Sequence, residues 1–265
     1  MRLEITHETR YTLAHPARRS VQYLRLTPRA DRCQRVESWT IGGPERIRPW
    51  TDGYGNLVHV ATESDVHDAI AIRVAGIVST RDTAGVLPLD DGLPPDMFLR
   101  PTALTRVSEA IAGFAKPFAE MRPRQGDIAT LHTMMAAQAD AIAFEAGFTD
   151  AATPAAAAFA NGRGVCQDHT HIFIAACRVV GLPCRYVSGY LAAGQGDVAT
   201  HAWAEAFVAD LGWVSFDVAN RQSATDAYVR LAVGPDYAAV APVIGVRTGG
   251  GGEEISVAVQ VRQVQ

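Results

Sequence analysis

The stretch Gly-Val-Cys-Gln-Asp-His-Thr-His, residues 164–171, places a cysteine between a glycine turn and a predicted helix. Apolar residues follow at helical spacing as far as Val180, and Gly181 predicts the end of that helix. A helix N-terminus stabilises a thiolate through its dipole and its unpaired N–H groups. The stretch therefore predicts a nucleophilic Cys166, whose own N–H is the expected donor to an oxyanion forming beside the sulfur.

Two later segments carry the other side chains that thiol chemistry needs. Residues 200–205, Thr-His-Ala-Trp-Ala-Glu, open a predicted strand in which His201, Trp203 and Glu205 share one face. Alanines occupy the other face, which predicts close approach by a packed helix. Asp217 ends the next predicted strand, where it would hold the imidazole in one tautomer. We expect His201 to act as general base and acid and Asp217 to orient it.

Each of these residues has a plainer interpretation when it is taken alone. A cysteine that opens a helix is often structural, a histidine that opens a strand is often a surface group, and an aspartate that ends a strand is often a turn former. Their order and local settings together favour catalysis. A metal site formed by Cys166, Asp168, His169 and His171 is not favoured, because helical offsets of 0, 3 and 5 do not share a face. No metal or organic cofactor is predicted.

The composition narrows the class of protein. A chain of 265 residues with 48% hydrophobic residues can bury one large core or two unequal ones. A formal net charge of −4 argues against nucleic-acid binding. No apolar stretch approaches the roughly 18 residues of a membrane span, and the N-terminus lacks a signal-peptide pattern. Four cysteines are too sparse for a disulfide framework, although a Cys177–Cys184 bridge stays open. We expect a cytoplasmic protein without nucleic-acid or membrane partners.

The order of predicted elements indicates an α+β protein. Residues 3–79 hold short alternating runs separated by turns, which predict an antiparallel β region. Four prolines mark residues 80–101 as a surface connector. The sequence then predicts helices at about 102–115, 124–144, 154–161 and 166–180, and strands at about 184–192, 201–209, 212–217 and 255–261. A glycine-containing loop at 194–197 adjoins His201. We divide the chain into a β-rich region with its connector, residues 1–100, and a catalytic core with C-terminal strands, residues 101–265.

These segments resemble the bacterial transglutaminase-like superfamily. The family pattern Gly-Val-Cys-Gln-Asp-x-x-His is complete at residues 164–171, and residues 200–203 and 212–217 match its Thr-His-Ala-Trp and Gly-Trp-x-x-Phe-Asp blocks. Residues 52–56, Asp-Gly-Tyr-Gly-Asn, and residues 229–237 resemble regions that flank such cores. Two departures are visible: residues 217–220 read Asp-Val-Ala-Asn in place of Asp-Pro-Thr-Asn, and Pro235 replaces a basic residue.

The resemblance implies a papain-like, transglutaminase-like cysteine-proteinase core preceded by an antiparallel β region. It implies Cys166 as nucleophile, His201 as base and acid, and Asp217 as orienting group. Four further residues are candidates for supporting the oxyanion or the triad, with no chemical role given by the motif alone: Gln167, Asp168, His171 and Trp203. Apart from the resemblance, the tryptophans are expected mostly in the core, and a place in the wall of the acyl site is the alternative for Trp203.

The predicted activity is attack on peptide or side-chain carboxamide bonds through a thioester acyl-enzyme, with a protein or peptide as substrate. Hydrolysis is favoured over crosslinking, because an intracellular crosslinking enzyme needs a control device and the sequence shows none. Two alternatives stay open. One is acyl transfer from a thioester donor, as in arylamine acetyltransferases, and the other is a noncatalytic peptide-binding module.

Overall fold

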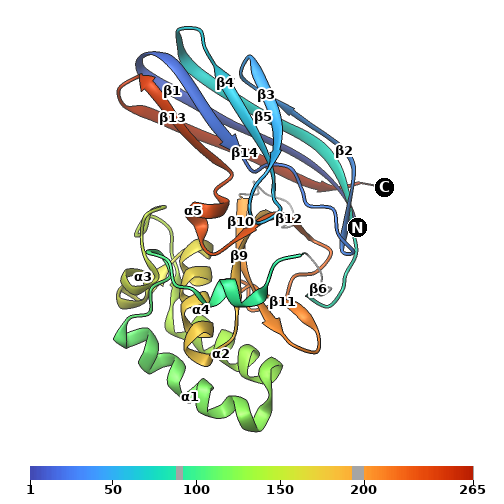
Figure 1. Ribbon diagram of the computed structural model, residues 1–265, viewed down its shortest axis with the longest axis vertical. Coiled ribbons are helices and arrows are strands. Elements are labelled where there is room, and N and C mark those ends of the chain that lie inside the picture. The colour runs from blue at the N-terminus through green and yellow to red at the C-terminus, as the bar shows by residue number, and fades with distance from the viewer. Residues whose placement is uncertain (88–91, 193–199, 265) are drawn as a thin grey trace.

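The computed structural model describes residues 1–87, 92–192 and 200–264 (Figure 1). Its strands are β1 (Arg2–Leu24), β2 (Gln34–Gly42), β3 (Arg46–Thr51), β4 (Leu57–Glu63), β5 (His67–Thr80), β6 (Val86–Leu87), β7 (Ala143–Phe144), β8 (Arg163–Gly164), β9 (Cys184–Leu191), β10 (Thr200–Val208), β11 (Gly212–Phe216), β12 (Tyr228–Gly234), β13 (Val243–Gly249) and β14 (Glu253–Gln263). Its helices are α1 (Glu109–Gln125), α2 (Asp127–Ala141), α3 (Ala155–Asn161), α4 (Cys166–Val180), α5 (Tyr237–Val240) and the 3₁₀ helix η1 (Pro95–Leu99). The loop expected at 194–197 and Pro88 of the connector lie outside the described residues.

The N-terminal sheet is antiparallel, as the alternating sequence predicts. Its strand order is β2-β5-β1-β4-β3, and β13 and β14 also pair with β1. The long strand β1 pairs with β5 and β14 through its first half and with β4 and β13 through its second half. The sequence division at residue 100 groups residues 243–263 with the core, whereas these residues are hydrogen-bonded to β1. The sheet therefore takes strands from both ends of the chain, and the two termini lie close together (Figure 1).

A second antiparallel sheet, of order β12-β9-β10-β11-β6, lies between the N-terminal sheet and the helices (Figure 1). On one face, alanines 202, 204 and 206 of β10 pack into a core with α1, α2, α3 and α4, which confirms the close helix approach that the sequence predicts. On the other side, Tyr190 and Leu231 pack with Leu3 and Ile5 of β1. The α+β class is therefore confirmed, and the central sheet carries both His201 and the contact with the N-terminal region.

Two of the helix predictions had the wrong bounds. The helices expected at 102–115 and 124–144 are α1 at Glu109–Gln125 and α2 at Asp127–Ala141, separated by Gly126 at φ 79°. Helix α1 begins after Ser108, whose side chain caps the Ile111 N–H, and it continues through Pro117 and Pro123. A proline inside a helix costs about 3 kcal/mol. Burial of the α1 face against α4 outweighs that cost.

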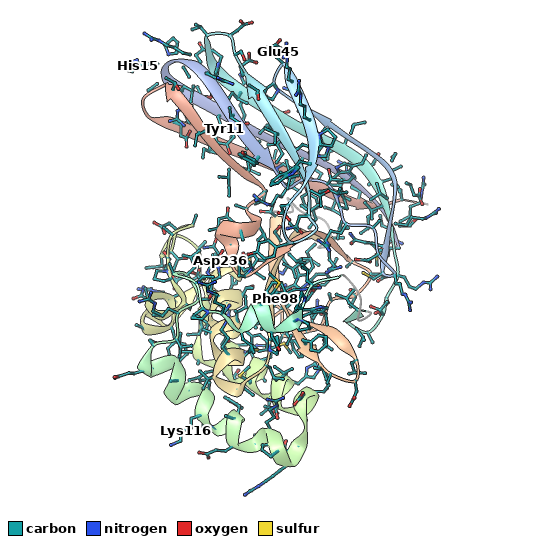
Figure 2. The ribbon with its side chains drawn as sticks, in the orientation of Figure 1. Tyr11, His15, Glu45, Phe98, Lys116 and Asp236 are labelled. Carbon is teal, nitrogen blue, oxygen red and sulfur yellow. The ribbon has the colours of Figure 1, made fainter. Side chains whose placement is uncertain are left out.

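The sequence predicted that the connector at residues 80–101 runs over the surface, but part of it is buried. Phe98 of η1 is fully buried and packs edge-on against Trp213 with ring centroids 5.3 Å apart. The Phe98 carbonyl accepts a hydrogen bond from Arg178 Nε at 3.0 Å. Phe98 lies near the middle of the molecule, whereas Lys116 of α1 projects from the outer side of the helices (Figure 2). An apolar ring from the connector thus closes the core beside β11.

The turn at residues 52–56 joins the N-terminal region to β12. Asp52 accepts hydrogen bonds from the Tyr54 and Asn56 N–H groups, which fixes the turn. The Asn56 side chain then mimics a strand neighbour, because its Nδ2 donates to the Val233 carbonyl and its Oδ1 accepts from the Val233 N–H, both at 2.9 Å. The Asp-Gly-Tyr-Gly-Asn segment therefore has a docking role.

A buried set of charges forms a second link between the two parts. Glu205 of β10 lies 2.8 Å from Arg185 Nε of β9 and 2.8 Å from Arg230 Nε of β12. Arg230 also pairs with Asp31, which precedes β2. Glu205 is 0% exposed and both arginines are buried. Two cations and two anions balance, so loss of one charge leaves an uncompensated charge in the interior.

The four cysteines are free, and the Cys177–Cys184 bridge that the spacing left open is not formed. The two thiols are hydrogen-bonded to one another inside the core. Among the described residues, no helix is long and apolar enough to cross a membrane.

The Glu205→Gln variant should lose about 3–5 kcal/mol of unfolding free energy, because Arg185 and Arg230 would stay buried without their shared carboxylate. Urea unfolding measures the loss. The matched control is Glu8→Gln, whose ion pair with Arg73 is exposed and should contribute less than about 1 kcal/mol. Equal losses in the two variants would contradict the structural role of the buried charges.

Candidate active site

Cys166 is the first residue of α4, as the sequence predicts. The first intrahelical bond of this helix runs from the His169 N–H to the Val165 carbonyl, so the Cys166 N–H lies before the helical ladder. Asp168 Oδ2 accepts a hydrogen bond from the Val165 N–H at 2.8 Å and fixes the turn that precedes the cysteine. A Cβ on Gly164 would stand 2.6 Å from the Asp168 side chain. This close approach explains the glycine of the motif.

His201 and Asp217 meet on the central sheet beside Cys166. His201 Nε2 lies 2.6 Å from Asp217 Oδ2, and the His201 side chain is hydrogen-bonded to the side chain of Cys166. An ionised carboxylate only accepts hydrogen bonds, so Nε2 carries a proton and Nδ1 is left to face the sulfur. The three predicted residues are therefore brought into one chain of contacts, from thiol to imidazole to carboxylate.

The electrostatics of the pair favour a charged imidazole. Burial acts to lower the pKa of His201, but its hydrogen bonds to Asp217 and Cys166 and their charges outweigh that effect and raise the pKa to about 9. Burial likewise acts to raise the pKa of Asp217, yet the hydrogen bond and charge of His201 hold it below its ordinary value. At neutral pH the site therefore holds an imidazolium between a carboxylate and the sulfur of Cys166.

Two residues that the sequence reasoning did not assign hold the carboxylate. The Tyr228 hydroxyl donates to Asp217 Oδ2 at 2.7 Å, and Asn220 Nδ2 donates to the same oxygen at 2.7 Å. Asn220 Nδ2 also lies 3.3 Å from His201 Nε2, but both groups are donors, so this contact is not a hydrogen bond when the imidazole is charged. Asn220 ends the Asp-Val-Ala-Asn segment, so replacement of its two middle residues leaves both polar ends in contact.

Trp203 is buried and supports the imidazole of His201 from behind. It is 0% exposed, and its ring stacks on that of His201 with centroids 6.1 Å apart. Tyr228 packs edge-on against Trp203 at 5.2 Å. A Cβ on Gly189, which pairs with His201 across the sheet, would stand 2.5 Å from the Trp203 ring. Trp203 is therefore core material, as the sequence predicts, and its place in the wall of an acyl site stays a prediction.

The other candidates that follow Cys166 are held by nearby loops. Gln167 Nε2 donates to the Asp150 carbonyl at 3.2 Å, and Asp168 Oδ2 also accepts from Thr149 Oγ1 at 2.7 Å. His171 Nε2 accepts from the Tyr237 N–H at 3.1 Å, and burial lowers the pKa of His171 to about 4. These residues therefore fix the start of α4 and its surroundings, with a neutral His171 beneath.

The residues that a metal site would need are not arranged as ligands. Burial lowers the pKa of His169, whose ring stacks on Phe144 with centroids 6.2 Å apart. His171 contacts Tyr186 on a different side of the helix, with ring centroids 5.1 Å apart. Across residues 1–87, 92–192 and 200–264, no group of three or more histidine, cysteine, aspartate or glutamate side chains is placed to hold a metal ion.

Two tyrosines near the thiol were also not assigned from the sequence. Burial, together with the charge of Cys166, raises the pKa of both Tyr186 in β9 and Tyr237 in α5. Both hydroxyls therefore stay protonated at neutral pH, and the two rings lie 6.2 Å apart. For Tyr237 the signal in the sequence was the family extension at residues 229–237, whose end contacts His171 of α4.

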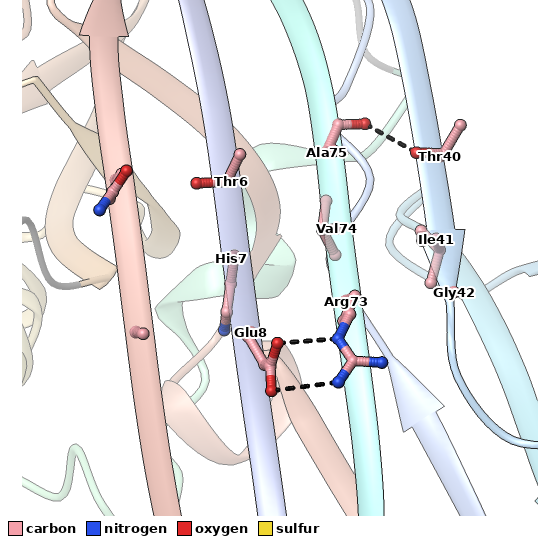
Figure 3. A pocket seen from close by; sticks show the side chains of 11 residues that line it. Thr6, His7, Glu8, Thr40, Ile41, Gly42, Arg73, Val74 and Ala75 are labelled. Carbon is pink, nitrogen blue, oxygen red and sulfur yellow. Dashed lines mark hydrogen bonds and ion pairs between the residues drawn. The ribbon is translucent and has the colours of Figure 1, made fainter.

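A separate groove of about 560 Å³ lies on the N-terminal sheet. It is formed by strands β1, β2, β5 and β14, and Glu8 and Arg73 make a double hydrogen bond along it (Figure 3). None of the candidate catalytic residues lines this groove. We therefore place the chemistry at the start of α4.

Comparisons with known proteins agree with this fold. Residues 118–218 match the family model of the transglutaminase-like superfamily, and residues 3–79 match that of the bacterial transglutaminase-like N-terminal region. An uncharacterized protein of Mycobacterium leprae is 29% identical over 99% of both chains. An uncharacterized protein of Mycobacterium tuberculosis is 26% identical over 92% of this chain and 87% of its own.

A crystal structure described as a "putative cysteine protease" from Cytophaga hutchinsonii superposes with a TM-score of 0.80 at 18% identity. It covers 100% of this chain and 91% of its own, and at that identity the likeness shows the fold alone. The fold and the site thus define a transglutaminase-like core with a thiol at the start of its buried helix. The chain belongs to the bacterial transglutaminase-like superfamily, with the superfamily core following its N-terminal region.

In NMR titrations of the imidazole, His201 should titrate near pH 9 in the folded protein, against 6.5 for an ordinary histidine. In Asp217→Asn the midpoint should fall by about one to three pH units, because burial lowers the pKa of His201 and the Asp217 charge that opposes this effect is removed. The raised pKa stabilises the fold fully below about pH 6.5, and this contribution is lost as the pH rises through 9. An unchanged midpoint in Asp217→Asn would contradict the assigned contact.

The Gly164→Ala variant should lose about 1–3 kcal/mol of unfolding free energy, because the new methyl group must displace Asp168. Gly113→Ala is the matched control, since Gly113 is exposed in α1 with nothing within 4 Å of an added Cβ. The control should be neutral or stabilising by up to about 1 kcal/mol. Thermal and urea unfolding measure both. Equal effects in the two variants would show that Asp168 does not require the glycine.

Proposed function

We propose that the protein is a thiol enzyme that attacks peptide or side-chain carboxamide bonds and forms a thioester on Cys166. The observation that carries the proposal is the contact chain from Cys166 through His201 to the buried Asp217. A thiol becomes a nucleophile at neutral pH when a cation and a helix N-terminus stabilise its thiolate. Both conditions are supported by the raised pKa of His201 and by the position of Cys166 at the start of α4.

The acylation step uses each of these groups once. The Cys166 thiolate attacks the carbonyl carbon, and the resulting oxyanion accepts a hydrogen bond from the Cys166 N–H at the helix N-terminus. The C–N bond then breaks, and His201 gives its Nδ1 proton to the departing amine. Asp217 keeps Nε2 protonated and the ring in place throughout. The products are a thioester on Cys166 and a free amine.

The deacylation step returns the enzyme to its starting state. His201, neutral after acylation, takes a proton from water, and the resulting hydroxide equivalent attacks the thioester. The C–S bond breaks, the acid leaves, and the thiolate and the imidazolium are restored. Water needs no second binding site, and this favours hydrolysis over transfer to an amine. The experiments below distinguish hydrolysis from two alternatives, acyl transfer from a thioester donor and noncatalytic peptide binding.

Alkylation by iodoacetamide tests the state of the thiol. In the native protein Cys166 should react at least about tenfold faster than in the denatured chain at pH 7, because its thiolate is stabilised. His201→Ala should slow this reaction by about 10²-fold. Mass spectrometry of the labelled peptides separates Cys166 from Cys33, which is hydrogen-bonded to Asp31 and provides an internal control.

Equal labelling of Cys166 in the native and denatured chains, with no effect of His201→Ala, would contradict the proposal and favour a binding module. Incubation with acetyl-CoA and an arylamine tests the second alternative. Turnover there, with none on peptide amides, would replace the hydrolase by an acyltransferase.

A further inference from the structure

A loop beside the nucleophile exposes two phenylalanines. Phe144 is 61% exposed and Phe148 is 47% exposed, in a segment where residues 143–148 are all exposed. Single exposed apolar residues are common on protein surfaces. These two are unusual because other side chains hold both rings in fixed positions, which is not needed for a solvated loop.

Each ring rests on a polar or charged partner. The Phe144 ring is stacked on the buried His169, at an interplanar angle of 17°. The Arg163 guanidinium lies 3.4 Å from the centre of the Phe148 ring, and Arg163 also pairs with Glu145. Such a cation–π contact fixes a ring with one face covered and the other available. We call Phe144 and Phe148 the phenylalanine ledge.

The ledge is tied to the start of α4 by the backbone. Strand β7 pairs with β8, so that Phe144 is the partner of Gly164, and the Glu145 N–H donates to the Gly164 carbonyl at 2.9 Å. Gly164 is two residues from Cys166. The far end of the loop is held through the bond from Thr149 to Asp168. The ledge therefore keeps its position relative to the sulfur.

The stacking partner of Phe144 connects the ledge to the triad as well. His169 lies one turn after Cys166, is 2% exposed, and has both ring nitrogens buried without a hydrogen-bond partner. Burial lowers the pKa of His169, and the charges of Asp168 and then of Asp217 act in the opposite direction. The ring of Phe144 thus covers a buried, neutral imidazole that lies near the Asp217 carboxylate. A bound side chain on the ledge would lie next to the reacting groups.

We propose that Phe144 and Phe148 bind an apolar side chain of the acyl-donor peptide, close to the carbonyl that Cys166 attacks. This inference rests on the proposed function and names its substrate class: peptides that carry an aromatic or large aliphatic residue near the reacting bond. Burial of such a side chain removes apolar surface from water on both partners. Small or acidic residues at that position gain nothing from the ledge.

Matched peptidyl vinyl sulfones test the ledge. The Cys166 thiolate adds to the vinyl carbon, the C=C π bond breaks, and the neighbouring carbon takes a proton. Two pairs of probes carry Phe or Ala, either next to the sulfone or one residue further away. For at least one pair, the Phe probe should label Cys166 about tenfold faster than the Ala probe, after normalisation to the rate with iodoacetamide.

Three variants locate the preference. Phe144→Ala should bring the Phe/Ala rate ratio close to one, and Phe144→Leu should retain part of it because an apolar surface remains. Trp50→Ala is the matched control, since Trp50 is an aromatic residue in β3 that is 54% exposed. The control should keep the wild-type ratio.

A wild-type ratio near one for both pairs, or a ratio that survives in Phe144→Ala, would overturn the ledge. Loss of the ratio in Trp50→Ala would overturn it too, because the effect would then not be local. These results leave the thiol chemistry intact whenever iodoacetamide still labels Cys166 rapidly. Slow labelling by iodoacetamide in the wild-type protein is the distinct result that removes the proposed function and the ledge together.

Discussion

The hydrogen bond between the buried carboxylate of Asp217 and His201 is the interaction on which the site depends. Removing a carboxylate from water is costly unless hydrogen bonds and an opposite charge compensate for it. His201, Tyr228 and Asn220 supply that compensation. Although burial acts to lower the pKa of His201, Asp217 and Cys166 together raise it, and the bond to Asp217 leaves the other ring nitrogen for Cys166. The requirement to satisfy one buried charge thus sets the protonation and orientation of the imidazole.

The fold places these groups through non-local pairings. Strand β10 carries His201, β11 leads to Asp217 and β12 begins with Tyr228, so three strands of one sheet converge on the carboxylate. Alanines on β10 let α4 approach closely enough for Cys166 to reach the imidazole. The N-terminal region stabilises this arrangement from the opposite side. Asn56 is hydrogen-bonded to Val233 of β12, and Asp31 forms an ion pair with Arg230.

The motif residues were predictable because their constraints are local. Gly164 must lack a side chain beside Asp168, and the periodicity after Cys166 identifies a buried helix. Tyr228 could not be assigned, because its contact with Asp217 depends on how β12 returns to β9. The predicted bounds of α1 were wrong for a related reason. By local rules a helix ends before a proline such as Pro117, whereas α1 continues through Pro117 because it packs on α4.

The long-range pairings were equally hidden. The sequence analysis assigned β13 and β14 to the catalytic core, but both strands pair with β1 in the N-terminal sheet. Likewise, Phe98 lies among connector prolines, and its burial follows from Trp213 on a distant strand. Catalytic roles, a peptide substrate and a cytoplasmic location stay predictions of the sequence.

Trapping of the acyl-enzyme tests the central claim most directly. The protein would be mixed with a library of peptide amides, quenched with acid within one turnover, digested and examined by mass spectrometry. The account predicts an acyl group joined to Cys166 by a hydroxylamine-sensitive thioester, present in the wild-type protein and absent in Cys166→Ser and His201→Ala. Cleavage of the peptides with no acyl group on Cys166, or with undiminished rate in Cys166→Ser, would contradict it.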